Sequence, residues 1–296
     1  MTDLLYALWG LVATPLSYGF MREALLVAVL TGAVCAVLSC YLVLKGWSLM
    51  GDAVSHAVLP GIVLAVVLGL PLAVGAFAAG LFCAVATGYL KDNSRVKEDT
   101  VMGIVFSGMF GLGLVLFTKV ETDQHLLHIL FGNMLGVTQR DLIETAVVAG
   151  LTLAIVLAKR RDLLLYCFDP QHARAVGLRV EWLHYGLLVL LSLTIVASLK
   201  AVGVILVVAM LVAPGATAYL VTRRFDRMLV VAASVAIFSS VLGTLVSFHI
   251  NGSTGPCIVL IQAGFFALAL LWDQVVRPRR QVPEPLAIGA SRHADH

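Results

Sequence analysis

Long apolar stretches alternate with short polar connections along almost the whole chain. An α-helix rises about 1.5 Å per residue, so an uncharged stretch of about 20 residues can cross the hydrocarbon core of a membrane. The pattern therefore predicts an all-α, polytopic membrane protein with nine transmembrane helices, or eight if the first span or residues 119–141 are assigned differently. The nine are expected near residues 24–44, 49–69, 72–90, 101–118, 142–158, 184–199, 201–221, 228–248 and 256–273.

The two ends of the chain do not follow this pattern. Residues 4–20 are apolar, but a proline and a glycine interrupt them, so we expect the segment 1–23 to lie along the membrane surface. Residues 276–296 are polar and predict a C-terminal tail. The sequence thus predicts a single transmembrane domain, residues 1–275, followed by this tail.

The composition supports a membrane protein. Hydrophobic residues make up 60% of the 296 residues and charged residues 12%, with a mean hydropathy of +0.98. Soluble domains carry about 25% charged residues. The five cysteines are scattered and form no C-x-x-C pair, so neither a disulfide framework nor a thiolate metal site is expected.

The basic residues predict the orientation, because Lys and Arg gather in cytoplasmic loops. Sixteen of the twenty lie in connections on one side of the predicted spans: Lys45, Lys91, Arg95, Lys97, Lys159, Arg160, Arg161, Arg174, Arg179, Arg223, Arg224, Arg227, Arg277, Arg279, Arg280 and Arg292. This places the C-terminal tail of the multi-pass chain in the cytoplasm. Nine spans put the N-terminal segment outside, whereas eight put it inside.

Asp52 and His56 lie inside the second apolar stretch, four residues apart, so they share one face of a helix. Ionisable groups at membrane depth are costly and usually mark a transport pathway or a relay. An oxygen ligand beside a nitrogen ligand suits a divalent transition metal. We favour passage of a metal over the simpler alternative, a polar pair that is satisfied by neighbouring helices.

The depth of the pair follows from the helix rise. His56 lies roughly 16 Å from Lys45 along the chain, close to the middle of a core about 30 Å thick. Pro60 lies one turn beyond His56 and removes a helix hydrogen bond, which can bend the helix or leave a carbonyl facing a cavity.

A second polar group is expected on the external side. Glu121, Asp123, His125 and His128 lie close together in one connection and could pass a cation toward the membrane. Solvated loop charges are the commoner explanation of such a group.

The longest cytoplasmic connection, residues 159–181, predicts a short helix. Asp169 is a suitable N-cap, Pro170 fits the first helical position, and Gly177 fits the C-cap. A rigid helix of two turns between two spans can transmit force from a cytoplasmic partner. The alternative is an ordinary loop helix that lies on the bilayer.

Several enzyme motifs are absent from the sequence. It has no G-x-x-x-x-G-K-[ST] loop for nucleotide phosphates and neither an H-E-x-x-H nor a G-x-S-x-G motif. We therefore expect a transport protein and not an enzyme, with no permanently bound cofactor and no nucleic-acid partner.

Five segments together resemble the membrane permease of bacterial ATP-binding-cassette importers for zinc, manganese and iron. The segments occur in the family's order over residues 15–275. They are L-K-G-W-S-L-M-G-D-A-V-S-H-A-V-L-P-G (44–61), K-E-D-T-V-M-G-I-V-F-S (97–107), F-D-P-Q-H-A-R-A-V-G (168–177), A-V-G-V-I-L-V-V-A-M with P-G-A-T (201–210 and 214–217), and S-T-G-P (253–256).

The resemblance implies a two-fold dimer of identical or related permeases, two cytoplasmic ATPases and an external solute-binding protein. The family's intramembrane metal pair falls on Asp52 and His56. Its coupling helix, which docks in a groove of the ATPase, falls on Asp169–Gly177, including Pro170, Ala173 and Arg174. ATP hydrolysis would then belong to a separate chain.

The resemblance also indicates the cargo. The segments K-G-W-S and P-G-A-T resemble the manganese and iron branch of the family more than the zinc branch. Mn²⁺ or Fe²⁺ is therefore expected, and Zn²⁺ is the alternative. A secondary metal transporter driven by protons or sodium is a further alternative. That class usually carries several acids within its spans and often shows inverted repeats, neither of which we detect here.

Overall fold

The computed structural model describes residues 13–119 and 136–276. In these residues the chain forms α-helices joined by short connections, with no strand. The helices are α2 (Gly19–Lys45), α3 (Met50–Leu68), α4 (Leu72–Asp92), α5 (Glu98–Phe117), α7 (Gln139–Ala158), α8 (Arg160–Phe168), α9 (Pro170–Ala175), α10 (Val180–Val202), α11 (Val204–Val221), α12 (Phe225–Ile250) and α13 (Thr254–Val276).

Nine of these helices are long and apolar enough to cross a membrane, and they correspond to the nine predicted spans. The prediction of an all-α, polytopic protein is therefore confirmed for the described residues. Some of the predicted spans were too short. Helix α2 begins at Gly19 and not at residue 24, so the last part of the segment 1–23 belongs to the first span. The rest of that segment lies mostly outside the described residues.

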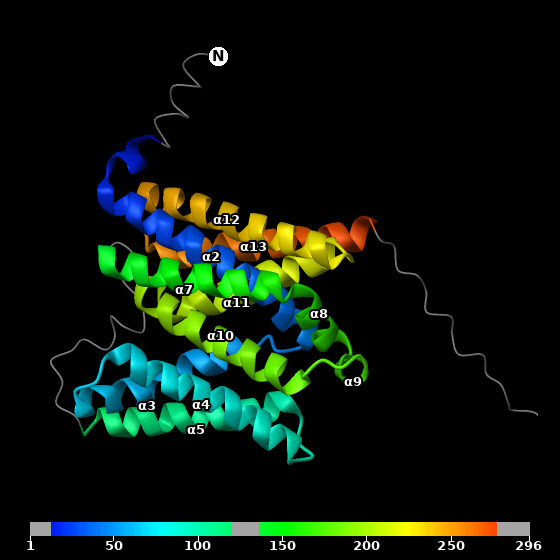
Figure 1. Cartoon of the computed structure of the whole chain (residues 1–296). Coiled ribbons are helices and arrows are strands. Elements are labelled where there is room, and N and C mark those ends of the chain that lie inside the picture. The colour runs from blue at the N-terminus through cyan, green and yellow to red at the C-terminus, as the bar shows by residue number, and fades with distance from the viewer. Residues whose placement is uncertain (1–12, 120–135, 277–296) are drawn as a thin grey trace, which may run out of the picture.

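The helices form two groups that α10 connects. Helices α3, α4 and α5 lie side by side on one side, and α2, α11, α12 and α13 lie together on the other (Figure 1). Helix α10 contacts α4 and α3 of the first group, α2 and α11 of the second, and also α7. This arrangement places α3, which carries Asp52 and His56, between α5 and the central helices.

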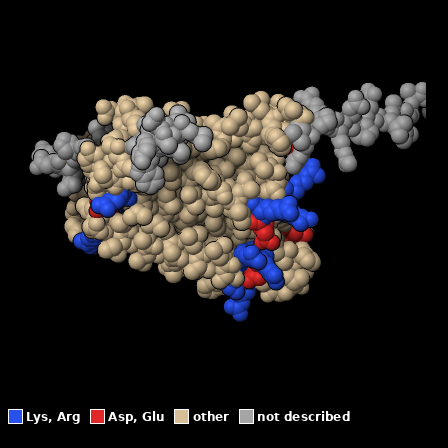
Figure 2. Space-filling model, turned by 90° about the horizontal axis from the view of Figure 1, so that it is seen from above, with Lys and Arg blue, Asp and Glu red and all other residues tan. Residues whose placement is uncertain are grey.

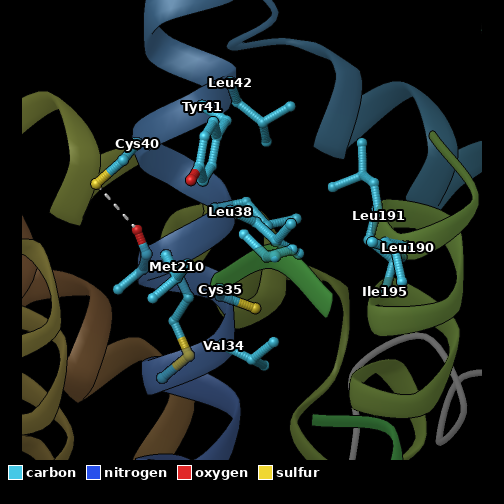
Figure 3. Close-up of a cluster of buried hydrophobic side chains, with 14 of the residues drawn as sticks. Val34, Cys35, Leu38, Cys40, Tyr41, Leu42, Leu190, Leu191, Ile195 and Met210 are labelled. Atoms are coloured by element: carbon cyan, nitrogen blue, oxygen red, sulfur yellow. Dashed lines mark hydrogen bonds between the residues drawn. The ribbon is translucent and has the colours of Figure 1, made fainter. Parts of the chain in front are cut away.

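Helix α2 forms the centre of the larger group and is buried along most of its length. Figure 3 shows Leu38 and Leu42 of α2 beside side chains of α10. It also shows Met210 of α11 beside α2. Leu38, Leu191 and Ile195 have no exposed surface. Such a core fixes α2 and α10 relative to each other.

Small residues bring the spans close, as expected where lipid tails give no hydrophobic drive for helix association. Gly61 of α3 lies directly against Gly75 of α4, so that a side chain at either position would collide with backbone. Gly215 of α11 similarly meets Ser39 of α2. The Ser39 hydroxyl accepts a hydrogen bond from Gly215 N (3.0 Å), next to Pro214. Pro214 therefore lies at a packing contact.

Charged side chains gather at the two ends of the molecule. On the face shown in Figure 2, an uncharged surface separates a small group of charges at one end from a larger group at the other. The larger group lies at the end that carries α8, α9 and the C-terminus of α13 in Figure 1. We call this end the α9 end. Its assignment to the cytoplasm stays a prediction from the distribution of Lys and Arg.

Candidate functional site

Asp52 and His56 face each other on α3. Asp52 lies in the first turn of the helix and His56 one turn later, with 3.3 Å between His56 Nε2 and Asp52 Oδ1. Ser55, between them in sequence, donates its hydroxyl to Gly51 O within the same helix (2.7 Å) and does not take part in the pair. A carboxylate and an imidazole therefore present their polar atoms to the same space.

The aromatic neighbours of His56 show its depth in the bundle. Its ring lies 5.4 Å from the ring of Phe110 and 6.2 Å from that of Phe106, centroid to centroid. Both phenylalanines lie near the middle of the 20-residue helix α5. Gly51, beside Asp52, packs against Leu211 near the middle of the 18-residue helix α11. The pair thus lies at the middle depth that the sequence predicts.

The pair is nevertheless not enclosed by the chain. The side chain of His56 is 32% exposed and that of Asp52 39%. His56 Nδ1 is buried and has no hydrogen-bond partner among the described residues. An ionisable group that faces lipid at this depth costs several kcal/mol, whereas one that faces protein or water in a cavity does not. The open side of the pair therefore has to be covered by something other than lipid.

The described residues offer at this pair only part of the coordination sphere that a metal ion needs. Within the described residues, no group of three or more His, Cys, Asp or Glu side chains could hold a metal ion. First-row divalent metals in proteins take four to about six ligands. Pro60 has no N–H to bond the His56 carbonyl, so that oxygen lacks its usual helix donor and adds a further polar atom near the pair.

The turn before α3, residues 46–49, is held by side chains from distant segments. The Lys45 ammonium lies 4.3 Å from the centre of the Tyr166 ring. The Tyr166 hydroxyl is 2.7 Å from His184 Nδ1, and the His184 ring packs edge-on against Trp47 at 5.3 Å. Trp47 and Tyr166 are almost fully buried. We call Lys45, Trp47, Tyr166 and His184 the turn cluster.

Sequence reasoning missed the turn cluster. Its members come from α2, the following turn, α8 and α10, and more than 100 residues separate Trp47 from Tyr166. The available signal was chemical: a Tyr and a His at the ends of apolar stretches need polar partners when they are buried, and here each partners the other.

The nearby Cys167 is almost fully buried. Burial raises the pKa of its thiol to about 12, despite a smaller opposing effect of Lys45, so the thiol stays protonated.

The predicted short helix is present as α9. The Asp169 carboxylate accepts hydrogen bonds from the N–H groups of Gln171 (3.0 Å) and His172 (2.9 Å), and Pro170 takes the first helical position. Gly177 has a φ of +85° and donates its N–H to Arg174 O (3.0 Å). The helix ends at Ala175, slightly before the predicted Gly177 cap.

One face of α9 is uncovered. Ala173 is completely buried and anchors the helix to the bundle, whereas Phe168 and Val176 are 68% and 55% exposed. The side chain of Arg174 is also exposed. Phe168 ends α8 and Val176 directly follows α9, so two exposed apolar side chains flank the short helix that carries Arg174. Together they make a candidate surface for a protein partner.

Three other features that the sequence pointed to are the external polar group, the C-terminal tail and Glu144. Glu121, Asp123, His125 and His128 lie outside the described residues, as does the tail after Val276. Glu144, which lies near a span end, contacts Arg140 (3.1 Å) and Lys200 (3.4 Å).

Comparison with known proteins adds independent findings. Residues 17–273 match the model of the ABC 3 transport family. The chain is 63% identical, over 97% of both proteins, to the chelated iron transport system membrane protein YfeD of Yersinia pestis. It is 52% identical to the manganese transport system membrane protein MntB of Synechocystis sp., over 90% of this chain and 87% of that one.

A solved structure has the same fold. A chain of PsaBC from Streptococcus pneumoniae, solved in complex with Fab, is 38% identical and superimposes with a TM-score of 0.79. The match covers 89% of this chain and 95% of that one. The resemblance found in the sequence motifs is thereby confirmed.

Proposed function

The chain belongs to the ABC 3 transport family, and we propose that it is the membrane subunit of an ATP-driven importer that carries manganese or ferrous iron across the plasma membrane. Relatives named for iron and for manganese support this cargo. Zinc is the alternative within the same family, because an oxygen and nitrogen ligand pair accepts all three ions. The observation that carries the proposal is the half-open Asp52–His56 pair at the middle depth of the bundle.

A second permease copy, or a related permease, would complete the site. Two pairs across a two-fold axis would supply two carboxylates and two imidazoles, enough for a divalent ion. Helix α5 beside the pair offers a surface for close approach. A side chain added at Gly103, Gly108 or Gly111 would meet no atom within 4 Å, so no described helix covers this face. Gly103, Ser107 and Gly111 recur every four residues, a spacing of small residues that allows close packing of membrane helices.

The energy source would be a separate cytoplasmic ATPase that docks on α9. Asp169, Pro170 and Gly177 keep the helix rigid, Ala173 fixes it to the bundle, and Arg174 lies on its exposed side. An external solute-binding protein would deliver the ion. It would also select it, since the pair alone would bind zinc more tightly than manganese.

The turn cluster would connect the two sites mechanically. Tyr166 lies on α8, directly before α9, and its hydroxyl meets His184, which packs on Trp47. Asp52 follows that turn within one helical turn. A shift of α9 would therefore move the start of α3, and with it the geometry of the Asp52–His56 pair.

Uptake of labelled ions tests the proposal. In cells without other importers, this chain with its partner proteins should restore accumulation of labelled manganese or iron in an ATP-dependent manner. Zinc uptake alone would move the chain to the zinc branch. Uptake that persists without ATP and depends on a proton or sodium gradient would favour a secondary transporter. No transport of any of the three ions would contradict the metal-importer function.

A further inference from the structure

A cavity of about 540 Å³ lies between the start of α8 and the start of α12, at the α9 end of the molecule. Four of its lining residues are arginines: Arg160 and Arg161 of α8, Arg224 directly before α12, and Arg227 in its first turn. None of these residues belongs to the ion site or to α9. The cavity therefore needs an explanation of its own.

The cavity is strongly basic. Asp226 is the only acidic residue in its lining, so four positive charges and one negative charge leave a net charge of +3. Arg160 Nη1 lies 3.2 Å from Asp226 Oδ1. In the described parts of the chain, the ion pairs include none with Arg161, Arg224 or Arg227. Three guanidinium groups thus remain to attract an anion.

The chemistry of the lining favours a phosphate group. Arg presents paired N–H donors in a planar fork that matches two phosphate oxygens, whereas Lys offers only a point charge. The start of the 26-residue helix α12 lies in the same wall, and its first N–H groups add positive potential. Leu164 and Phe225 supply an apolar part of the wall.

The position of the cavity favours a lipid as the source of that phosphate. The transmembrane helix α7 ends at Ala158, two residues before Arg160, and α12 begins at Phe225. Span ends of this kind lie at the level of the lipid headgroups. Helix α9 follows the far end of α8, about 12 Å away at the rise of a helix. The cavity thus lies at the membrane border, away from the surface expected to contact the ATPase.

We propose that this cavity binds the headgroup of an anionic phospholipid from the adjacent leaflet. The arginines would hold the phosphate, while the apolar wall would contact the start of the acyl chains. The proposal does not depend on which ion is carried or on how transport is driven. It gives the arginines a role beyond the general excess of basic residues at this end.

The test is lipid binding by the full-length chain purified with its partner proteins in neutral detergent. Native mass spectrometry would compare phosphatidylglycerol with phosphatidylcholine at equal concentrations. The double variant R161Q/R227Q removes two charges and retains the Arg160–Asp226 pair. The matched control R95Q/K97Q removes two charges from the exposed α4–α5 connection at the same end. At about 1 kcal/mol per basic residue, R161Q/R227Q should bind phosphatidylglycerol at least tenfold more weakly, and the control should bind it normally.

Other outcomes would overturn the proposal. An equal loss in both double variants would indicate a general surface effect and no site. Inorganic phosphate that displaces the lipid at similar concentration would identify a site for soluble anions. Normal lipid binding with loss of the copurifying ATPase would identify a protein contact. If R161Q/R227Q elutes as aggregate, the single variants R161Q and R227Q replace it, and unchanged affinity in both would exclude the cavity.

Discussion

Helix α9 and the Asp52–His56 pair are both short motifs that the sequence pointed to, but only α9 is complete within one chain. The Asp169 carboxylate and Gly177 satisfy the ends of α9 with groups at most a few residues away. Asp52 and His56 contact each other, but the pair is open on one side. The buried His56 Nδ1 has no hydrogen-bond partner among the described residues. The contrast fits the roles proposed for them, a rigid docking helix for α9 and an adjustable ion site for the pair.

The difference has a physical reason. A structural helix should hold one geometry, so all its end groups are satisfied locally. A site that passes an ion has to release it, so a full and rigid set of ligands would slow transport. The turn cluster lies between the two regions and would carry movement from one to the other.

The largest effect on ion uptake is expected from substitutions in the proposed ion site, the Asp52–His56 pair. Asp52→Ala and His56→Ala should each reduce labelled manganese or iron uptake about a hundredfold or more, because loss of even an outer-shell partner costs a metal site 10- to 100-fold. The amount of protein in the membrane should not change. Glu144→Gln is the control, since this carboxylate lies near a span end and contacts Arg140 and Lys200. Normal uptake by both alanine variants would remove the pair from the pathway.

Breaking α9 should also stop transport, but through loss of coupling to the ATPase and not through loss of ion binding. Ala173→Pro removes the hydrogen bond from Ala173 N to Asp169 O (3.0 Å) and costs the helix about 3 kcal/mol or more. We expect uptake to fail and ATP hydrolysis to lose its response to the external binding protein. Ion binding by the Asp52–His56 pair should remain.

Gln171→Ala is the control for α9, because Gln171 is exposed and alanine keeps the helix. If Ala173→Pro assembles with the ATPase and transports normally, another connection must carry the coupling.

The smallest effect is expected from a substitution in the turn cluster, which lies between α9 and the Asp52–His56 pair. Tyr166→Phe removes the hydroxyl that meets His184 but keeps the ring under Lys45. One hydrogen bond is worth about 1 kcal/mol, so uptake per ATP hydrolysed should fall about fivefold with hydrolysis retained. Tyr185→Phe is the matched control, since the Tyr185 ring also packs edge-on against His184. Equal behaviour of the two variants would mean that the turn cluster only stabilises the fold.

The sequence located the spans well because each is an apolar run of membrane length. It placed several ends wrongly because apolar runs stop at the first charged residue, whereas helices continue past it. Helix α10 begins at Val180, with Glu181 in its first turn, although the apolar pattern begins only at residue 184. An acid in the first turn complements the helix dipole, so the helix extends beyond the membrane core.

What the sequence determined by itself is local: the apolar spans, the shared face of Asp52 and His56, and the caps of α9. These depend on residues a few positions apart, so periodicity and residue type are sufficient. Only the tertiary structure decided that the pair is open on one side, that Tyr166, His184 and Trp47 meet, and that four arginines share one cavity. Those contacts join segments tens to more than a hundred residues apart, and their geometry depends on how whole helices pack.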